Sequence, residues 1–168
     1  MLVCAGGPAA AQEAFAGIYR HGVDTPFTLE TSEGGVNVTF GYRFAPVGEL
    51  AAFGRPAPYL VASLNTEGDT SFAGGGLSWS FGNGPFYVRP ALGLVVHDGP
   101  GHRVDAITGM RTDLGSRVLF EPELGVGYRL SDRIALEASW MHVSHARLFD
   151  SEQNPGIDVI GLRANIGL

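Results

Sequence analysis

Apolar and polar residues alternate with a period of two through most of the chain, from about residue 15 to its end. Eight segments show the alternation, and most approach the ~9–11 residues that a tilted membrane strand needs. They span residues 14–23, 35–44, 58–65, 70–81, 85–97, 115–128, 133–144 and 157–167, with turn-forming residues between them. Period two is typical of strands with two different faces. The pattern therefore predicts an all-β protein.

The two faces of the segments indicate their surroundings, because successive side chains of a strand point to opposite sides of a sheet. In segment 35–44 one face carries Val36, Val38, Phe40 and Tyr42, and the other carries Asn37, Thr39, Gly41 and Arg43. Segments 85–97 and 115–128 repeat this division. Glycine with a few arginines and glutamates suits the crowded interior of a small barrel, whereas an apolar face with aromatic residues suits lipid. We therefore predict an eight-stranded antiparallel transmembrane β-barrel of the outer-membrane type.

The connections between the segments support this barrel only in part. Short turns at 82–85 and 130–133 alternate with longer connections at 24–34 and 98–114, and short inner turns with longer outer loops are typical of such barrels. The inner connection 45–57 is longer than this rule expects. Pro90 and Pro122 also count against the prediction, because a proline inside a paired strand removes a ladder hydrogen bond.

Composition excludes several other classes of protein. The chain has 168 residues, enough for one domain, and its apolar runs are shorter than the roughly 18 residues of a spanning helix. The net charge is −6 and all 11 basic residues are arginine. A nucleic-acid partner is not expected, because it would require a basic stripe.

The first residues have the character of an export signal whose beginning is missing. Ala9 and Ala11 precede Gln12 as small residues precede a signal-peptidase site. We expect residues 1–11 to be this remnant and residues 12–168 to form a single barrel domain. The alternative is a disordered terminus rich in alanine and glycine. Since Cys4 is the one cysteine of the sequence, the mature chain would have neither a disulfide nor a cysteine-based metal site.

Three side chains of hydrolase chemistry meet at the last two segments. Parity places His142 and Ser144 on the apolar face of segment 133–144, and Asp158 on the same face of segment 157–167. The two segments form a hairpin, so the three side chains can cluster at the extracellular end. A serine whose proton is taken by a carboxylate-oriented histidine is the arrangement for acyl transfer, and a lipid-facing position favours a lipid ester. Polar girdle residues at the membrane interface are the alternative.

The same region carries a family resemblance. The stretch "WMHVSHARL" followed by "NPGIDVIGLR" resembles the C-terminal signature of the PagL-type lipid A 3-O-deacylases, outer-membrane barrels of the acyloxyacyl hydrolase family, and "HGVDTPFTLETSEGG" and "GSRVLFEPELGVGYR" are also similar to members. The resemblance implies Ser144 as nucleophile, His142 as general base and then acid, Asp158 as acidic partner and Asn154 as an oxyanion donor. His145 stands where the family has asparagine.

The resulting hypothesis is a serine esterase in the outer membrane of a Gram-negative bacterium that removes a 3-O-linked acyl chain from lipid A. Its partners would be lipopolysaccharide and outer-membrane lipids, with no cofactor or metal, and it would be a monomer or homodimer. Arg103, Arg111 and Arg147 are candidates for binding the lipid A phosphates. The positions of His97, His102 and Asp105 match no strong metal template and are better interpreted as surface-loop residues.

Two other functions stay open. One is a non-catalytic structural or adhesion barrel of the OmpA or OmpX kind, which would explain the strands but not the alignment of histidine, serine and aspartate. The other is a secreted soluble barrel that binds a lipid in its interior.

Overall fold

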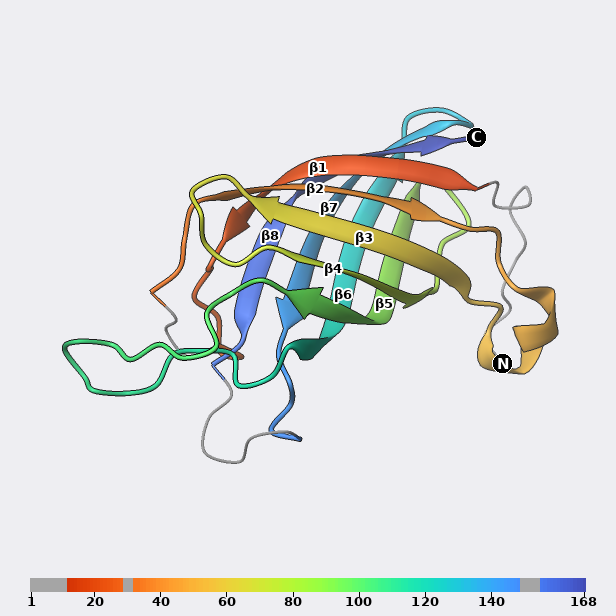
Figure 1. Ribbon diagram of the computed structural model, residues 1–168. Coiled ribbons are helices and arrows are strands. Elements are labelled where there is room, and N and C mark those ends of the chain that lie inside the picture. Colours follow the sequence, from red (N-terminus) through yellow and green to blue (C-terminus); the bar gives the residue numbers. More distant parts are fainter. Residues whose placement is uncertain (1–11, 29–31, 149–154) are drawn as a thin grey trace.

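The computed structural model describes residues 12–28, 32–148 and 155–168, and these form a closed barrel (Figure 1). Each strand pairs antiparallel with the next along the chain, and the last pairs with the first. The strands are β1 (Glu13–His21), β2 (Val36–Arg43), β3 (Ala57–Asn65), β4 (Phe72–Ser78), β5 (Phe86–His97), β6 (Val118–Arg129), β7 (Ile134–Val143) and β8 (Ile157–Gly167). The predicted eight-stranded barrel is confirmed. The proposed export signal at residues 1–11 lies outside the described residues.

The connections at the two ends of the barrel differ as the sequence indicated. The described parts of the connections after β1, β5 and β7 gather at one end, whereas the C-terminus lies at the other (Figure 1). The long inner connection contains a 3-10 helix, η1 (Gly48–Phe53), and the Trp79 indole N–H donates to the Phe53 carbonyl over 2.7 Å. In the described part of the chain, no helix is long and apolar enough to cross a membrane.

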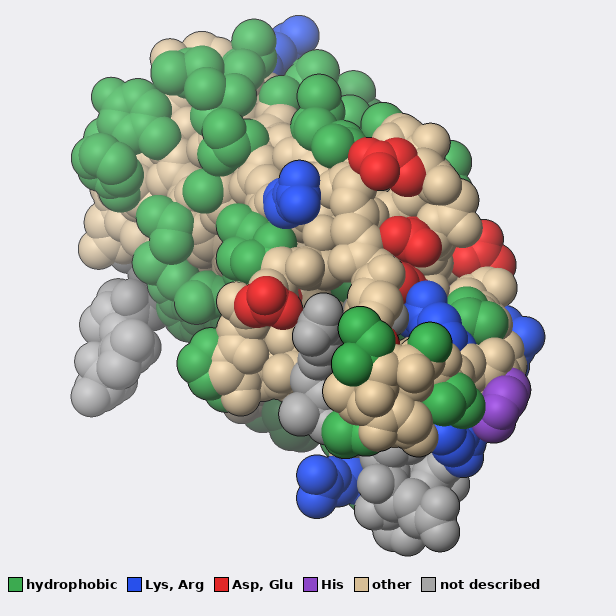
Figure 2. Space-filling model, turned by 90° about the vertical axis from the view of Figure 1, so that its left-hand side faces the viewer, with side chains coloured by type: hydrophobic (Ala, Val, Ile, Leu, Met, Phe, Trp, Pro, Cys, Tyr) green, Lys and Arg blue, Asp and Glu red, His purple; other side chains and the backbone are tan. Residues whose placement is uncertain are grey.

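The outer surface of the barrel wall is apolar. Large hydrophobic side chains on the outward faces of the strands are exposed, among them Val38, Phe40, Leu92, Leu94, Leu124, Val126, Leu162 and Ile166. Figure 2 looks onto the loop end and shows hydrophobic side chains over much of the wall, with charged side chains mainly around the loops. A band of this extent is unfavourable in water and favourable against hydrocarbon. The wall therefore faces lipid.

The interior is filled by paired charges, as the polar faces of the strands predicted. Arg163 contacts Glu123 at 2.6 Å and also binds Glu137, while Arg89 contacts Glu137 at 2.9 Å. Glu13 joins this network through Arg89, at 2.7 Å. Each buried charge in this network thus has a partner of opposite sign, which is the condition for burying charge.

Glycine makes room for these large side chains. A Cβ added at Gly93 would lie 2.5 Å from the Tyr59 hydroxyl and 2.8 Å from a Glu121 oxygen. Tyr59 donates to Glu121 across this gap. The high glycine content thus reflects an interior in which small residues face tyrosines, arginines and glutamates.

Pro90 lies inside β5 and Pro122 inside β6, and Pro122 interrupts the pairing of β6 with β7. The β6–β7 ladder runs from Glu123↔Met141 to Arg129↔Ala135, and Phe120↔Ser144 forms a separate bridge beyond it. In this register Pro122 would lie opposite His142. Because proline has no N–H to donate, the hydrogen-bond ladder between β6 and β7 is interrupted there, beside a candidate catalytic residue.

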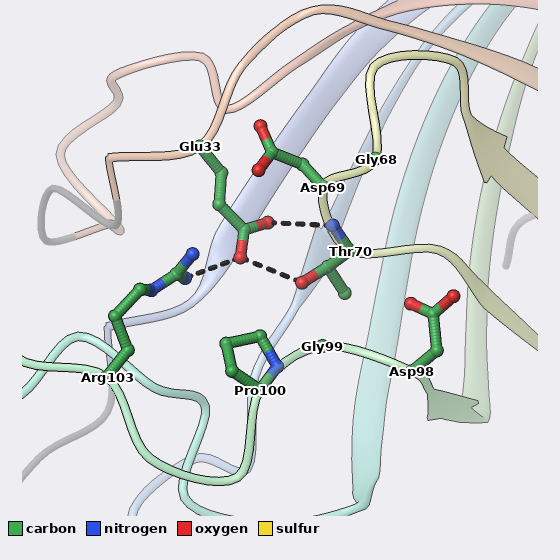
Figure 3. A pocket seen from close by; sticks show the side chains of 8 residues that line it. All are labelled: Glu33, Gly68, Asp69, Thr70, Asp98, Gly99, Pro100 and Arg103. Carbon is green, nitrogen blue, oxygen red and sulfur yellow. Dashed lines mark hydrogen bonds and ion pairs between the residues drawn. The ribbon is translucent and has the colours of Figure 1, made fainter.

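Glu33 ties three outer connections together (Figure 3). Its carboxylate accepts hydrogen bonds from His21 at 2.9 Å, from the Thr70 hydroxyl at 2.8 Å and from Arg103. These groups border a pocket of ≈ 290 Å³ lined by Glu33, Gly68, Asp69, Thr70, Asp98, Gly99, Pro100 and Arg103. Burial alone would raise the pKa of Glu33, but the hydrogen bonds and the charge of Arg103 lower it to about 2.

This shift predicts that stability depends on Glu33 in acid. A carboxyl whose folded pKa is depressed stabilises the fold above its unfolded pKa of about 4.5 and loses this effect as pH falls through about 2. We expect Glu33→Gln to lower the melting temperature at pH 6, and the difference from wild type to vanish by pH 2. Thermal unfolding in detergent, followed by tryptophan fluorescence, measures it. Glu67→Gln, at an exposed site in a neighbouring loop, is the control, and an equal effect there would contradict the assignment.

Candidate active site

His142, Ser144 and Asp158 form one hydrogen-bonded chain at the outer end of the barrel. His142 of β7 lies directly opposite Asp158 of β8 in the sheet register. The imidazole Nδ1 is 2.7 Å from Asp158 Oδ1, and Nε2 is 2.9 Å from Ser144 Oγ. The structure thus brings together the three side chains that the sequence singled out.

The order of these contacts defines the protonation of the imidazole. An ionised carboxylate can only accept a hydrogen bond, so the hydrogen lies on Nδ1 of His142 and is donated to Asp158. Nε2 is then left with its lone pair and accepts from the Ser144 hydroxyl. This tautomer is the one in which a histidine can take a proton from serine.

The three side chains lie on the outer face of the barrel, yet they are buried. Asp158 is 0% exposed, Ser144 6% and His142 8%. The segment that follows β1, residues 22–28, contacts Asp158 and Trp140 and so contributes to this burial. The Thr25 hydroxyl donates to Asp158 Oδ2, and the Phe27 ring lies 5.6 Å from Trp140, whose ring is 6.1 Å from that of His142. The sequence did not predict this cover.

A bulge at Gly22 turns the covering segment to the outside. His21 pairs with Val159, so regular pairing would place Gly22 opposite Asp158. Instead the Val23 N–H donates to the Asp158 carbonyl over 3.0 Å. The additional residue, Gly22, has a φ of 62°, which is typical of a glycine bulge. Because one added residue exchanges the two faces of a strand, Thr25 reaches the same face as Asp158.

Gly156 supports His142 from the β8 side. A Cβ at this position would lie 2.7 Å from His142 Cε1 and 3.5 Å from the Ser144 Cβ. The residue has a φ of 62°, where side chains are strained. Glycine therefore allows the chain to pass close against the imidazole.

On the β6 side, Ser144 is fixed through its backbone. The Phe120 N–H donates to the Ser144 carbonyl at 2.8 Å, and the Ser144 N–H donates to the Phe120 carbonyl at 3.1 Å. Beyond it, a turn closes with the Leu148 N–H on the His145 carbonyl at 2.9 Å. Its central residues, Ala146 and Arg147, have φ values of 52° and 58°. Two non-glycine residues in this region store strain next to the candidate nucleophile.

The other predicted site residues have varied surroundings. Arg103 binds Glu33, Arg111 contacts Asp113 at 2.8 Å, and Arg147 is exposed just after Ser144. His145 is fully buried. Asn154 lies outside the described residues. Among the residues that the structure describes, no group of three histidine, cysteine or acidic side chains is arranged to hold a metal.

The fold and its apolar wall define the class of the protein, an outer-membrane β-barrel, and solved structures agree. The outer membrane enzyme PagL matches with a TM-score of 0.65 at 15% identity, over 93% of this chain and 99% of that chain. Neisserial surface protein A matches with a TM-score of 0.61 at 7% identity, over 94% and 97%. The N-terminal barrel domain of OprF from Pseudomonas aeruginosa matches with a TM-score of 0.61 at 10% identity, over 95% and 98%.

A sequence comparison defines the family. The family described as "Lipid A 3-O-deacylase (PagL)" matches residues 27–166. No match was found among curated proteins. The chain belongs to the lipid A 3-O-deacylase family, and it is an ester hydrolase of the outer membrane of Gram-negative bacteria that acts on lipid A.

Proposed function

We propose that this chain removes the 3-O-linked acyl chain of lipid A by serine catalysis with Ser144, His142 and Asp158. The observation that carries the proposal is the continuous chain of contacts from Ser144 Oγ through the imidazole to Asp158, at 2.9 and 2.7 Å. It lies on the face of the barrel that meets lipid, so a membrane-embedded ester can reach it without leaving the bilayer.

The reaction follows from this geometry. Ser144 Oγ attacks the ester carbonyl while His142 Nε2 takes its proton, and Asp158 stabilises the imidazolium that forms. When the tetrahedral intermediate collapses, the bond to the sugar oxygen breaks and His142 returns the proton to that oxygen. Water, deprotonated by His142, then attacks the acyl-serine, the bond between the acyl carbon and Ser144 Oγ breaks, and His142 returns the proton to Oγ as the fatty acid leaves.

The oxyanion requires donors other than the N–H of the nucleophile. The Ser144 N–H already donates to Phe120, and the residues that follow it, Ala146 and Arg147, form a turn with positive φ values directly next to the nucleophile. We assign oxyanion binding to this turn, with Asn154 as the further donor that the family resemblance implies. Preorganised donors of this kind are often the largest contribution to acyl-transfer catalysis.

The acyl chain approaches from the β6 side. On the β8 side, Asp158, Gly156 and the segment 22–28 surround the imidazole. On the β6 side, Phe120 pairs with Ser144, and Leu94 pairs with Phe120 on the same outer face. An apolar acyl chain over these residues replaces their contacts with membrane lipid by similar contacts, which costs little free energy.

Arg147, exposed beside the site, is the arginine best placed for a lipid A phosphate, since Arg103 and Arg111 bind carboxylates.

Phe120→Ala is expected to lower kcat/KM for lipid A about tenfold, because a truncated pocket residue loses apolar contact with the acyl chain. The backbone bridge to Ser144 does not depend on the side chain, so kcat should change little. Leu162→Ala, at an exposed position of the lipid-facing wall of β8, is the matched control. Initial rates in detergent micelles measure both variants. Equal losses in the two would contradict the β6 path.

The test of the function is mass spectrometry of lipid A from cells that express the chain behind an intact signal peptide, beside a Ser144→Ala strain. Loss of one hydroxyacyl chain only with the wild type is the expected result. Unchanged lipid A, with the barrel folded in the outer membrane, would overturn the proposal and favour a structural barrel.

A further inference from the structure

We infer that Thr25 is a positioning residue for Asp158 and that the segment 22–28 acts as a strap that holds the acidic partner of the site in register. The inference rests on the proposed function of the same site. It adds a fourth side chain to the hydrogen-bonded chain, supplied by a segment that lies 133 residues away in sequence.

The hydrogen bonds around the Thr25 hydroxyl fix its direction. The Phe27 N–H donates to Thr25 Oγ1 at 3.1 Å, so the oxygen accepts from the backbone of its own segment. Its hydrogen is then directed to Asp158 Oδ2. The other carboxylate oxygen, Oδ1, accepts from His142 at 2.7 Å. Each oxygen of Asp158 thus has its own donor, and rotation of the carboxylate would break both bonds.

Burial makes the second donor necessary. Asp158 is 0% exposed, so water does not replace a lost partner. A buried carboxylate oxygen without a donor carries the full penalty of its desolvation. Without Thr25, the carboxylate would turn to share its remaining donors, and the imidazole that it orients would follow.

The strap is held in place by its own hydrogen bonds and by contacts with β7 and β8. The Val23 N–H donates to the Asp158 carbonyl at 3.0 Å, which holds the start of the strap against β8. The Thr28 N–H donates to the Thr25 carbonyl at 3.2 Å, and the Thr25 N–H donates to the Thr28 hydroxyl at 3.2 Å. Phe27 packs against Trp140 of β7. Thr25 is therefore delivered to Asp158 by a preformed turn rather than by a free side chain.

The experiment compares Thr25→Val, which keeps the shape and removes the hydroxyl, with Thr25→Ser, which keeps the hydroxyl. With purified barrel and lipid A in detergent micelles, we expect Thr25→Val to lower kcat on the order of tenfold, the scale of one hydrogen bond to a charged group. KM should stay unchanged, and Thr25→Ser should restore kcat to near the wild-type value. In an Asp158→Ala background, Thr25→Val should cause no further loss, because the group that it positions is absent.

The outcomes separate this inference from the proposed function. A wild-type kcat in Thr25→Val, or an equal loss in the Asp158→Ala background, would overturn the role of Thr25 while serine catalysis stands. Full activity in Ser144→Ala would instead overturn the catalytic assignment. A second measurement needs no turnover: proton NMR of the low-field His142 Nδ1–H. This resonance should shift and exchange faster with water in Thr25→Val and recover in Thr25→Ser, and an unchanged resonance would contradict the inference.

Discussion

Ser144→Ala is expected to lower kcat for lipid A deacylation by about 10⁶-fold, or to the detection limit, because removing the nucleophile or the base alone costs about as much as removing the whole catalytic chain. His142→Ala should have the same effect, and the double variant should be no worse than either. Asp158→Ala should lose less, about 10⁴-fold, since it acts through the histidine. Single-turnover rates with purified, folded barrel measure all four.

The matched control is Ser139→Ala. Ser139 lies in β7, five residues before Ser144, but points into the barrel, where its hydroxyl is 2.8 Å from that of Tyr19. The substitution removes a buried serine hydroxyl from β7 without touching the candidate site, so activity should persist. Comparable losses in Ser139→Ala and Ser144→Ala would show that the barrel had been damaged in both, and would contradict the assignment of the nucleophile.

The strands and their faces could be predicted because both depend on local patterns. A strand has a side-chain period of two, and one buried and one lipid-facing surface leave that period in the sequence. The boundaries of the strands were predicted less accurately: the pattern placed a segment at 70–81, whereas β4 is Phe72–Ser78. Trp79 continues the alternation, but its indole N–H binds the Phe53 carbonyl of the inner connection.

The meeting of His142, Ser144 and Asp158 could also be predicted, because the hairpin of β7 and β8 joins neighbouring segments. Parity fixes the face and antiparallel pairing brings the strand end beside the next strand start. The burial of these residues could not be predicted in this way. It depends on Thr25, from a segment far away in sequence, and on the bulge at Gly22, which parity counting does not detect.

The prolines show how a local rule can point to a site. In the sequence, Pro122 counts against a paired strand, since it cannot donate to a ladder. In the structure β6 continues through it, and the missing donor falls opposite His142. The exception to the strand pattern therefore coincides with the place where β7 carries His142, as expected when function overrides regular pairing.

Arg163→Met is expected to destabilise the barrel by about 3–5 kcal/mol, the cost of removing one partner from a buried ion pair. Arg163 is 2% exposed and binds both Glu123 and Glu137. Its guanidinium carbon also lies 4.6 Å from the centre of the Phe15 ring. Methionine fills part of the volume but leaves the buried carboxylates of Glu123 and Glu137 without the positive charge of Arg163. Urea unfolding in detergent, followed by the gel shift of heat-modifiable barrels, measures the change.

Arg129→Met is the control for this prediction, because Arg129 is exposed near the inner end, donates to the Gly84 carbonyl and stacks 4.6 Å from the Tyr87 ring centre. It should cost less than about 1 kcal/mol, the usual effect of a surface charge. A similar small loss for Arg163→Met would mean that Glu123 and Glu137 become neutral or find water inside the barrel. A large loss would show that a protein with an apolar outside depends for stability on the charges that it keeps inside.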